Sequence, residues 1–189
     1  MITTANKYLG ELQETISGLP LKTLEKIKDI LLEAHQKNRQ IFMIGNGGSA
    51  STSSHITCDI AKGILGHTGE KKSKRFKIIS LNDNVALMSA WANDTIYDNI
   101  FSEQIKNLAK KDDIVIALSA SGNSPNIIKA VETANEISCI TIGLAGFNGG
   151  KLAKLTDICL TAKIDKYDIA EDTHLILGHI LTRWFFENV

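Results

Sequence analysis

Proline, cysteine and aromatic residues are scarce in this chain, and its charges cancel. The 189 residues include two prolines, three cysteines and 6% aromatic residues. Lys and Arg together number 21, as do Asp and Glu, so the whole chain offers no positive field that would attract a nucleic-acid backbone. We therefore expect no nucleic-acid partner, and an anionic ligand must be held by local geometry.

The cysteines and the hydropathy pattern exclude two further classes of protein. Cys58, Cys139 and Cys159 are odd in number, widely spaced and without a CxxC pair, which fits reduced thiols better than a disulfide framework or a zinc ribbon. No window approaches the roughly 20 apolar residues of a membrane span, and the N-terminus has no apolar stretch after a basic start. We expect a cytoplasmic protein with no membrane partner.

Apolar runs of strand length alternate with segments of helical spacing along most of the chain. The runs that predict buried strands are 41–44, 76–81, 114–118, 139–144 and 157–160. The segments that predict helices are 5–16, 21–35, 50–64, 85–108 with a break near Asn93 and Asp94, 125–137 and 168–187. Strands that alternate with helices indicate a parallel sheet covered on both faces.

We therefore predict an α/β fold, a three-layer α/β/α sandwich around a five-stranded parallel sheet with N-terminal helices added. The length suits a single domain over 1–189, with N-terminal helices at 4–38, an α/β core at 40–161 and a C-terminal helix at 168–187. In open sheets of this kind, ligands bind outside the carboxyl ends of the strands, in the loops that lead into helices. Two of those loops carry the strongest signals in the sequence.

The first loop has the sequence GNGGS at 45–49, between the first strand and the following helix. Its glycines let the backbone approach a ligand closely, and Ser49 can cap the helix. The loop is not a GxGxxG dinucleotide motif, because a glycine pair follows Asn46 and no acidic residue ends the second strand. We predict a ligand cradle, with a plain glycine turn as the alternative.

The second loop has the sequence SASGNSP at 119–125, after the third strand. Ser124 stands at the N-cap position of the next helix and Pro125 at its first position. Backbone N–H groups and the helix dipole favour a phosphate there, and the serine hydroxyls add donors without adding charge. We predict a phosphate site, with an ordinary serine-rich turn as the alternative.

Three other polar features of the sequence are interpreted from their spacing and composition alone. His55 and Asp59 lie four residues apart on the helix after the glycine loop, so both can face one ligand, or they form a surface pair worth about 0.2 to 0.5 kcal/mol. The basic run at 71–75 is interpreted as a solvated loop, with a phosphate-facing role as the alternative. His35 and His67 are interpreted as solvated histidines.

The segments GNGGSA at 45–50 and SASGNS at 119–124 resemble the SIS (sugar isomerase) domain family, which has a flavodoxin-like fold. His55, the pair Asn93 and Asp94, and the late His179 narrow the likeness to the phosphoheptose isomerases over nearly the whole chain. Those enzymes interconvert sedoheptulose 7-phosphate and D-glycero-D-manno-heptose 7-phosphate on the way to the heptoses of bacterial lipopolysaccharide or capsule. The resemblance implies this activity and a small phosphosugar substrate.

The resemblance also implies roles for particular positions. Asp59 is implied as the base at the substrate carbons and His179 as the acid at the oxygens of an enediol reaction. A zinc ion, one per subunit, is implied at His55, Asp59, Glu171 and His179, and these two histidines and two carboxylates form an acceptable zinc set. A homotetramer with active sites at subunit interfaces is implied as well. The expected substrate contacts are Asn46, Gly47, Gly48, Ser49, Asn93, Asp94, Ser119, Ala120, Ser121, Ser124 and Glu171.

Two positions depart from the family pattern, because Asp59 and Glu171 stand where glutamate and glutamine are usual. Aspartate is one methylene shorter, which changes the geometry of proton transfer. Glu171 and His179 are eight residues apart, about 12 Å of helix rise, so one straight helix cannot easily bring both to one ion. His174 competes with His179 for a catalytic role. The alternatives to a phosphoheptose isomerase are a non-enzymatic phosphosugar-binding or adaptor protein and an isomerase of another phosphosugar.

Overall fold

The computed structural model describes residues 1–66 and 74–189. Five parallel strands form one sheet in the order β2-β1-β3-β4-β5, which confirms the predicted five-stranded parallel sheet. The strands are β1 (Gln40–Ile44), β2 (Lys77–Ser80), β3 (Ile114–Ser119), β4 (Ile140–Ala145) and β5 (Ile158–Thr161). His67 and most of the basic run at 71–75 lie outside the described residues, so their interpretation stays a prediction.

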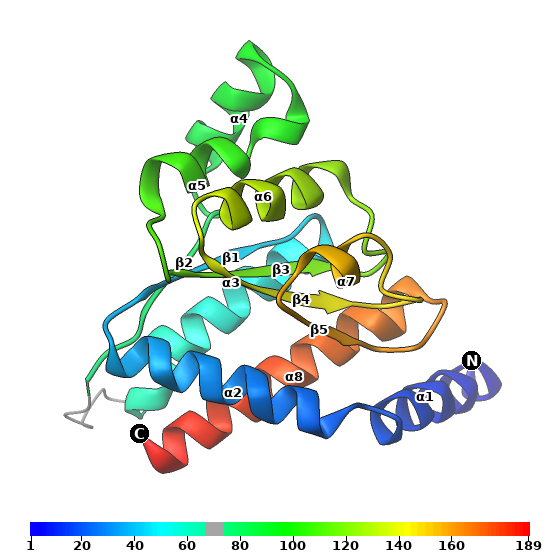
Figure 1. Cartoon of the computed structure of the whole chain (residues 1–189). Helices are drawn as coiled ribbons and strands as arrows, with labels where there is room; N and C mark the ends of the chain where they lie inside the picture. Colours follow the sequence, from blue (N-terminus) through cyan, green and yellow to red (C-terminus); the bar gives the residue numbers. More distant parts are fainter. Residues whose placement is uncertain (67–73) are drawn as a thin grey trace.

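Helices cover both faces of the sheet. They are α1 (Ile2–Ser17), α2 (Leu21–Gln36), α3 (Gly48–Ala61), η1 (Gly63–Leu65), α4 (Val85–Asp94), η2 (Tyr97–Asn99), α5 (Ser102–Leu108), α6 (Pro125–Glu136), α7 (Leu152–Leu155) and α8 (Tyr167–Asn188). Figure 1 shows α2, α3 and α8 on one face and α5 and α6 on the other, while α4 projects away from the sheet. The predicted break near Asp94 is present, because α4 ends at that residue.

Two hydrophobic cores separate the sheet from its helical layers. Every residue of β3 is buried, and the alternation of a strand divides its side chains between the two cores. Ile116 and Leu118 join the core on the α2, α3 and α8 side, whereas Val115 and Ala117 join the core beneath α5 and α6. This two-sided burial is why β3 reads as an unbroken apolar run in the sequence.

The sheet topology places the two predicted loops next to each other. Ile44 at the end of β1 pairs with Ala117 of β3. The chain leaves β1 toward β2 on one side and returns to β3 on the other, which makes the space between β1 and β3 the topological switch point. Open α/β sheets bind their ligands at this point.

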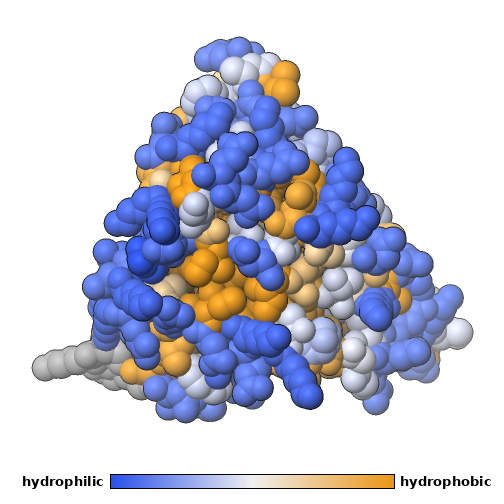
Figure 2. Space-filling model, viewed as in Figure 1, coloured by the Kyte–Doolittle hydropathy of each residue, from blue (hydrophilic) through white to orange (hydrophobic). Residues whose placement is uncertain are grey.

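Some apolar side chains stay at the surface. Every residue of α1 and α4 is at least partly exposed, and Leu9 and Val85 keep 60% and 71% of their surface. Figure 2 shows apolar atoms mainly around the middle of the visible face, with hydrophilic side chains over most of the rest. Among the described residues, no helix is both long and apolar enough to cross a membrane.

His35 differs from its interpretation as a solvated histidine. It is 7% exposed, and its Nε2 donates to the backbone oxygen of Lys74 over 2.8 Å. Its ring also packs on Phe76, with 4.3 Å between ring centroids. That interpretation is wrong, because the chain segment before β2 returns across the end of α2 and covers the ring.

Candidate active site

The glycine loop makes a sharp turn from β1 into α3. Gly47 has a φ of +53°, and a Cβ on Gly45 would lie 2.4 Å from the backbone oxygen of Ser49, so both positions require glycine. Gly47 is the N-cap residue and Gly48 the first residue of α3. The prediction that Ser49 caps the helix is therefore wrong, and Ser49 lies buried inside the first turn.

The serine loop opens α6 as predicted, with Ser124 at the N-cap and Pro125 at the first helical position. Instead of capping the helix, the Ser124 hydroxyl lies 3.3 Å from the hydroxyl of Ser119. Both hydroxyls lie at the N-terminus of a 12-residue helix, where the helix dipole favours an anion. This arrangement suits a phosphate group.

The chain segment after β4 is hydrogen-bonded to the backbone of the serine loop. Gly146 donates its N–H to the backbone oxygen of Ala120 over 2.8 Å, and Leu152 donates to Gly122 over 2.9 Å. Within the loop, the Ser121 hydroxyl accepts from the N–H of Asn123 over 3.2 Å. These hydrogen bonds hold the backbone of the predicted anion site in place.

Glu171 on α8 lies at the glycine loop. A Cβ on Gly48 would lie 2.2 Å from Oε2 of Glu171, so the carboxylate rests against the first residue of α3. Burial raises the pKa of this carboxyl, and the nearby Asp172 and Asp168 raise it further. Glu171 is thus placed at the predicted substrate loop.

Asn93 and Asp94 lie exposed at the end of α4, where Asn93 Nδ2 donates to Asp94 Oδ1 over 2.8 Å. Three residues later, the Tyr97 hydroxyl donates to Asn46 Oδ1 over 3.3 Å. This contact brings the end of α4 near the glycine loop. No sequence pattern indicated Tyr97, or Asn126, which also contacts Asn46 and lies 80 residues from it.

His55, Asp59 and His179 converge on one point between α3 and α8. The two histidine Nε2 atoms are 3.0 Å apart, and Asp59 Oδ2 lies 3.3 Å from His55 and 3.6 Å from His179. Both imidazoles are about half exposed, so the group is open to a ligand. A hollow of about 600 Å³ adjoins it, lined by Cys58, Asp59, Lys62, Gly63, Gly66, His179, Thr182, Arg183 and Phe186.

These three side chains fit a zinc ion. Bonds of 2.0–2.1 Å in a tetrahedral site place neighbouring ligand atoms about 3.3 Å apart, close to the separations in this group. Its ligand atoms all lie within 4.8 Å of one another. Within the described residues of one chain, Glu171 is not part of the group, which agrees with the helix rise between it and His179.

His174 has a different environment from His179. It is fully buried, and within the described residues neither ring nitrogen makes a hydrogen bond of normal geometry. Burial lowers its pKa to about 4, opposed by the backbone of Ala145. The neutral, enclosed ring of His174 therefore belongs to the core, whereas His179 faces the open hollow.

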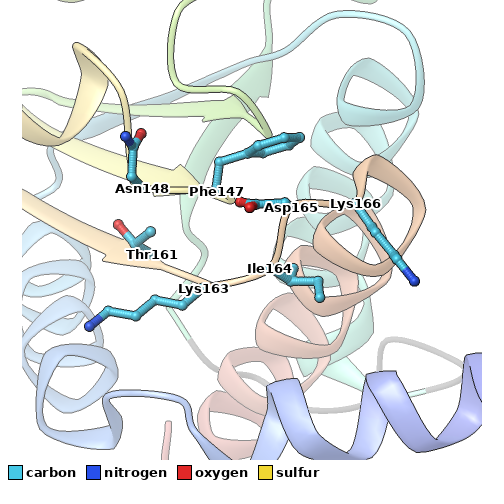
Figure 3. Close-up of a pocket in the computed structure, with 7 residues that line it drawn as sticks. All are labelled: Phe147, Asn148, Thr161, Lys163, Ile164, Asp165 and Lys166. Atoms are coloured by element: carbon cyan, nitrogen blue, oxygen red, sulfur yellow. The ribbon is translucent and has the colours of Figure 1, made fainter.

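A second hollow of about 600 Å³ opens beyond the carboxyl ends of β4 and β5 (Figure 3). It is lined by Phe147, Asn148, Thr161, Lys163, Ile164, Asp165 and Lys166, none of which is a predicted site residue. Lys166 is already paired with Glu11 over 2.5 Å. His55, Asp59, His179 and the serine loop lie elsewhere. The candidate active site is therefore formed by the loops after β1 and β3 and by the helices α3, α6 and α8.

Comparison with known proteins agrees with this site. The SIS domain family matches residues 6–146. A phosphoheptose isomerase of Helicobacter pylori (strain ATCC 700392 / 26695) is 34% identical over 172 residues, which cover 90% of this chain and 85% of the relative. A probable phosphoheptose isomerase of Thermoplasma acidophilum is 33% identical over 177 residues, 94% of each chain.

Solved structures give the same picture. A phosphoheptose isomerase from Francisella tularensis superposes with a TM-score of 0.88 at 25% identity, covering 98% of this chain and 96% of that one. The fold of phosphoheptose isomerase GmhA from Neisseria gonorrhoeae matches with a TM-score of 0.87 at 24% identity, covering 100% and 97% of the two chains. The chain therefore belongs to the SIS domain family and, within it, to the phosphoheptose isomerases.

Proposed function

We propose that this chain is a sugar-phosphate isomerase that interconverts sedoheptulose 7-phosphate and D-glycero-D-manno-heptose 7-phosphate. The observation that carries the proposal is the pairing of two features in one chain. One is the hydroxyl pair of Ser119 and Ser124 at the N-terminus of α6, and the other is the carboxylate of Asp59 beside His179. The names of the relatives support a seven-carbon sugar phosphate as the substrate.

The proposed reaction proceeds through an enediol. Asp59 removes a proton from the carbon next to the carbonyl group and returns it to the former carbonyl carbon, while His179, 3.6 Å from that carboxylate, moves a proton between the two oxygens. The serine loop holds the phosphate through hydroxyl and backbone donors. The glycine loop lets the sugar approach the backbone of Gly47 and Gly48, with Asn93 and Asp94 at its side.

We propose that His55, Asp59 and His179 hold one zinc ion per subunit. When bound, zinc would polarise a carbonyl or hydroxyl oxygen of the sugar as a Lewis acid, and it would replace the proton transfer by His179, whose Nε2 would then be a metal ligand. Glu171 as the fourth protein ligand requires a second chain or a rearranged α8, because in one chain its carboxylate rests on Gly48.

We further propose a cytoplasmic homotetramer with active sites at subunit interfaces, serving lipopolysaccharide or capsule synthesis. Asp59 lies eleven residues beyond Gly48, about 16 Å of rise along α3, so the two ends of the site are far apart within one chain. Exposed apolar side chains on three helices, such as Leu9, Val85 and Ile180, support contact with further copies.

Turnover of sedoheptulose 7-phosphate by the purified protein, followed by NMR of the sugar, tests the activity. The assay is run as purified, after chelation and after addition of zinc. Product that forms only with zinc supports the metal site. Product that forms without zinc supports acid–base catalysis by Asp59 and His179 alone. Binding of the sugar phosphate without product supports the non-enzymatic alternative. Asp59→Asn and His179→Ala should remain folded and inactive, and full activity in both contradicts the mechanism.

Mixing two inactive variants tests the shared site. Asp59→Asn damages the proton-transfer end, whereas Ser119→Ala with Ser124→Ala damages the phosphate end. If each site draws these ends from different subunits, mixed tetramers recover up to about a quarter of the sites intact. Unmixed variants are the controls, and mixtures that stay inactive after subunit exchange contradict an interface site.

A further inference from the structure

Asn46 of the glycine loop and Asn126 of α6 form a reciprocal side-chain pair. Asn46 Nδ2 donates to Asn126 Oδ1 over 2.8 Å, and Asn126 Nδ2 donates back to Asn46 Oδ1 over 2.8 Å. Asn126 is 1% exposed, so this pair is shielded from competing water on one side. The pair joins the loop after β1 to the helix that begins at the serine loop.

A backbone donor fixes the direction of both amides. The N–H of Ile127 donates to Asn126 Oδ1 over 3.0 Å, and a backbone N–H can only donate. Asn126 Nδ2 must therefore point toward Asn46, which in turn must present its Oδ1. The Tyr97 hydroxyl then donates to the same oxygen over 3.3 Å.

These contacts leave Asn46 with one available hydrogen-bonding group. Its Oδ1 has two lone pairs, which accept from Asn126 and Tyr97, and one of its two Nδ2 hydrogens is bound by Asn126. The second Nδ2 hydrogen has no partner among the described residues. In this state Asn46 can donate to a ligand oxygen but cannot accept from a ligand hydroxyl.

We propose that Asn126, assisted by Tyr97, is a positioning residue that presents one N–H of Asn46 to an oxygen of the bound sugar phosphate. The inference rests on the proposed function, because it makes Asn46 a substrate contact. Asn126 also lies between the glycine loop, the proposed contact of the sugar, and the serine loop, the proposed contact of the phosphate. A second link from α6, Lys129 Nζ to Asn99 Oδ1 over 2.5 Å, holds the segment that carries Tyr97.

A double-mutant cycle on kcat/KM for sedoheptulose 7-phosphate tests this role. Asn126→Ala should lower kcat/KM by about ten- to a hundredfold, and Tyr97→Phe by about threefold. In the Asn46→Ala background, Asn126→Ala should cause no further loss, because its effect passes through Asn46. The dissociation constant of inorganic phosphate should stay within about twofold in every variant, since the serine loop is left intact.

Two further variants serve as controls. Asn126→Asp keeps the acceptor for Ile127 but cannot donate to Asn46, so it should lose activity even if Asn126→Ala folds poorly. Asn135→Ala removes an asparagine from the other end of α6, where its Nδ2 donates to Leu155, and should leave kcat/KM unchanged.

Three results overturn the inference while the proposed function stands: equal losses from Asn126→Ala with and without Asn46, a parallel loss of phosphate binding, or no loss at all. If the wild type binds the sugar phosphate without turnover, the proposed function fails and the same cycle is measured on the dissociation constant of the sugar phosphate. If the wild type does not bind the sugar phosphate, both fail.

Discussion

Replacing Gly178 with alanine should damage the histidine–aspartate group more than it damages the fold. A Cβ at position 178 would lie 2.4 Å from Cγ1 and 2.5 Å from Cδ1 of Ile56, whereas ordinary contact begins at 3.4 Å. The helices must therefore separate by about 1 Å, because Ile56 is 3% exposed and its β-branched side chain has few other rotamers. Overpacking costs about 1–3 kcal/mol, and the better helix propensity of alanine offsets about 1 kcal/mol. We expect a net loss of about 0–2 kcal/mol.

The effect on the site should be larger, because Ile56 adjoins His55 and Gly178 adjoins His179. Functional groups must be held within about 0.5 Å, and a displacement of about 1 Å can cost a hundredfold in rate. We expect zinc affinity and turnover to fall by about ten- to a hundredfold while the thermal midpoint shifts by a few degrees. Zinc titration, turnover and thermal unfolding are measured on the same preparations.

A second substitution separates helix spacing from other causes. Ile56→Ala removes the two atoms that the new Cβ would meet, so the double variant with Gly178→Ala should regain zinc affinity despite lower stability. Wild-type zinc affinity in Gly178→Ala, or no recovery in the double variant, would refute the dependence of the group on this contact.

Two further predictions concern stability. Gly122 has a φ of +65°, and a Cβ there would lie 2.1 Å from the backbone oxygen of Gly149, so Gly122→Ala should cost at least about 2 kcal/mol in urea unfolding and abolish phosphate binding. Gly10→Ala, in open space on α1, is the control and should stabilise by about 0.5–1 kcal/mol; equal effects would contradict the argument. Because the pKa of His174 is lowered to about 4, the unfolded chain takes up its proton first as pH falls. The free energy of unfolding should thus fall between about pH 6.5 and pH 4, on the order of 3 kcal/mol, and His174→Gln should remove that part of the slope.

The fold was accessible from the sequence because its central strands, β1, β3 and β4, are buried on both faces. Apolar runs predicted all five strands, and the pair Asn93 and Asp94 predicted the break at the end of α4. The N-cap position of Ser124 was also readable, because Ser-Pro at a strand-to-helix junction is a local signal. The start of α3 was not, because the positive φ of Gly47 lets the helix begin at Gly48, one residue before the serine that was expected to cap it. Local chemistry thus fixes the elements better than their ends.

The site was only partly accessible, because its contacts join distant residues. The spacing of His55 and Asp59 indicated one helix face, but only the resemblance to a family indicated His179. The pairing of Asn46 with Asn126 left no signal, because an asparagine in a first helical turn has many ordinary uses. The place of Glu171 depends on how α8 crosses α3, which no local pattern specifies.

The parallel packing of α3 and α8 links the two ends of the proposed site. Contacts advance along both helices together, since Gly48 meets Glu171 and, further along, Ile56 meets Gly178. The helices therefore run in the same direction, and each histidine of the histidine–aspartate group lies one residue from the second contact. A glycine at that contact allows the backbones to approach closely, and the 3.0 Å between the histidine Nε2 atoms depends on that approach. A shift at the Gly178 contact would also move the Glu171 carboxylate, which lies against Gly48. Metal affinity and the position of the glycine loop relative to Glu171 should therefore change together.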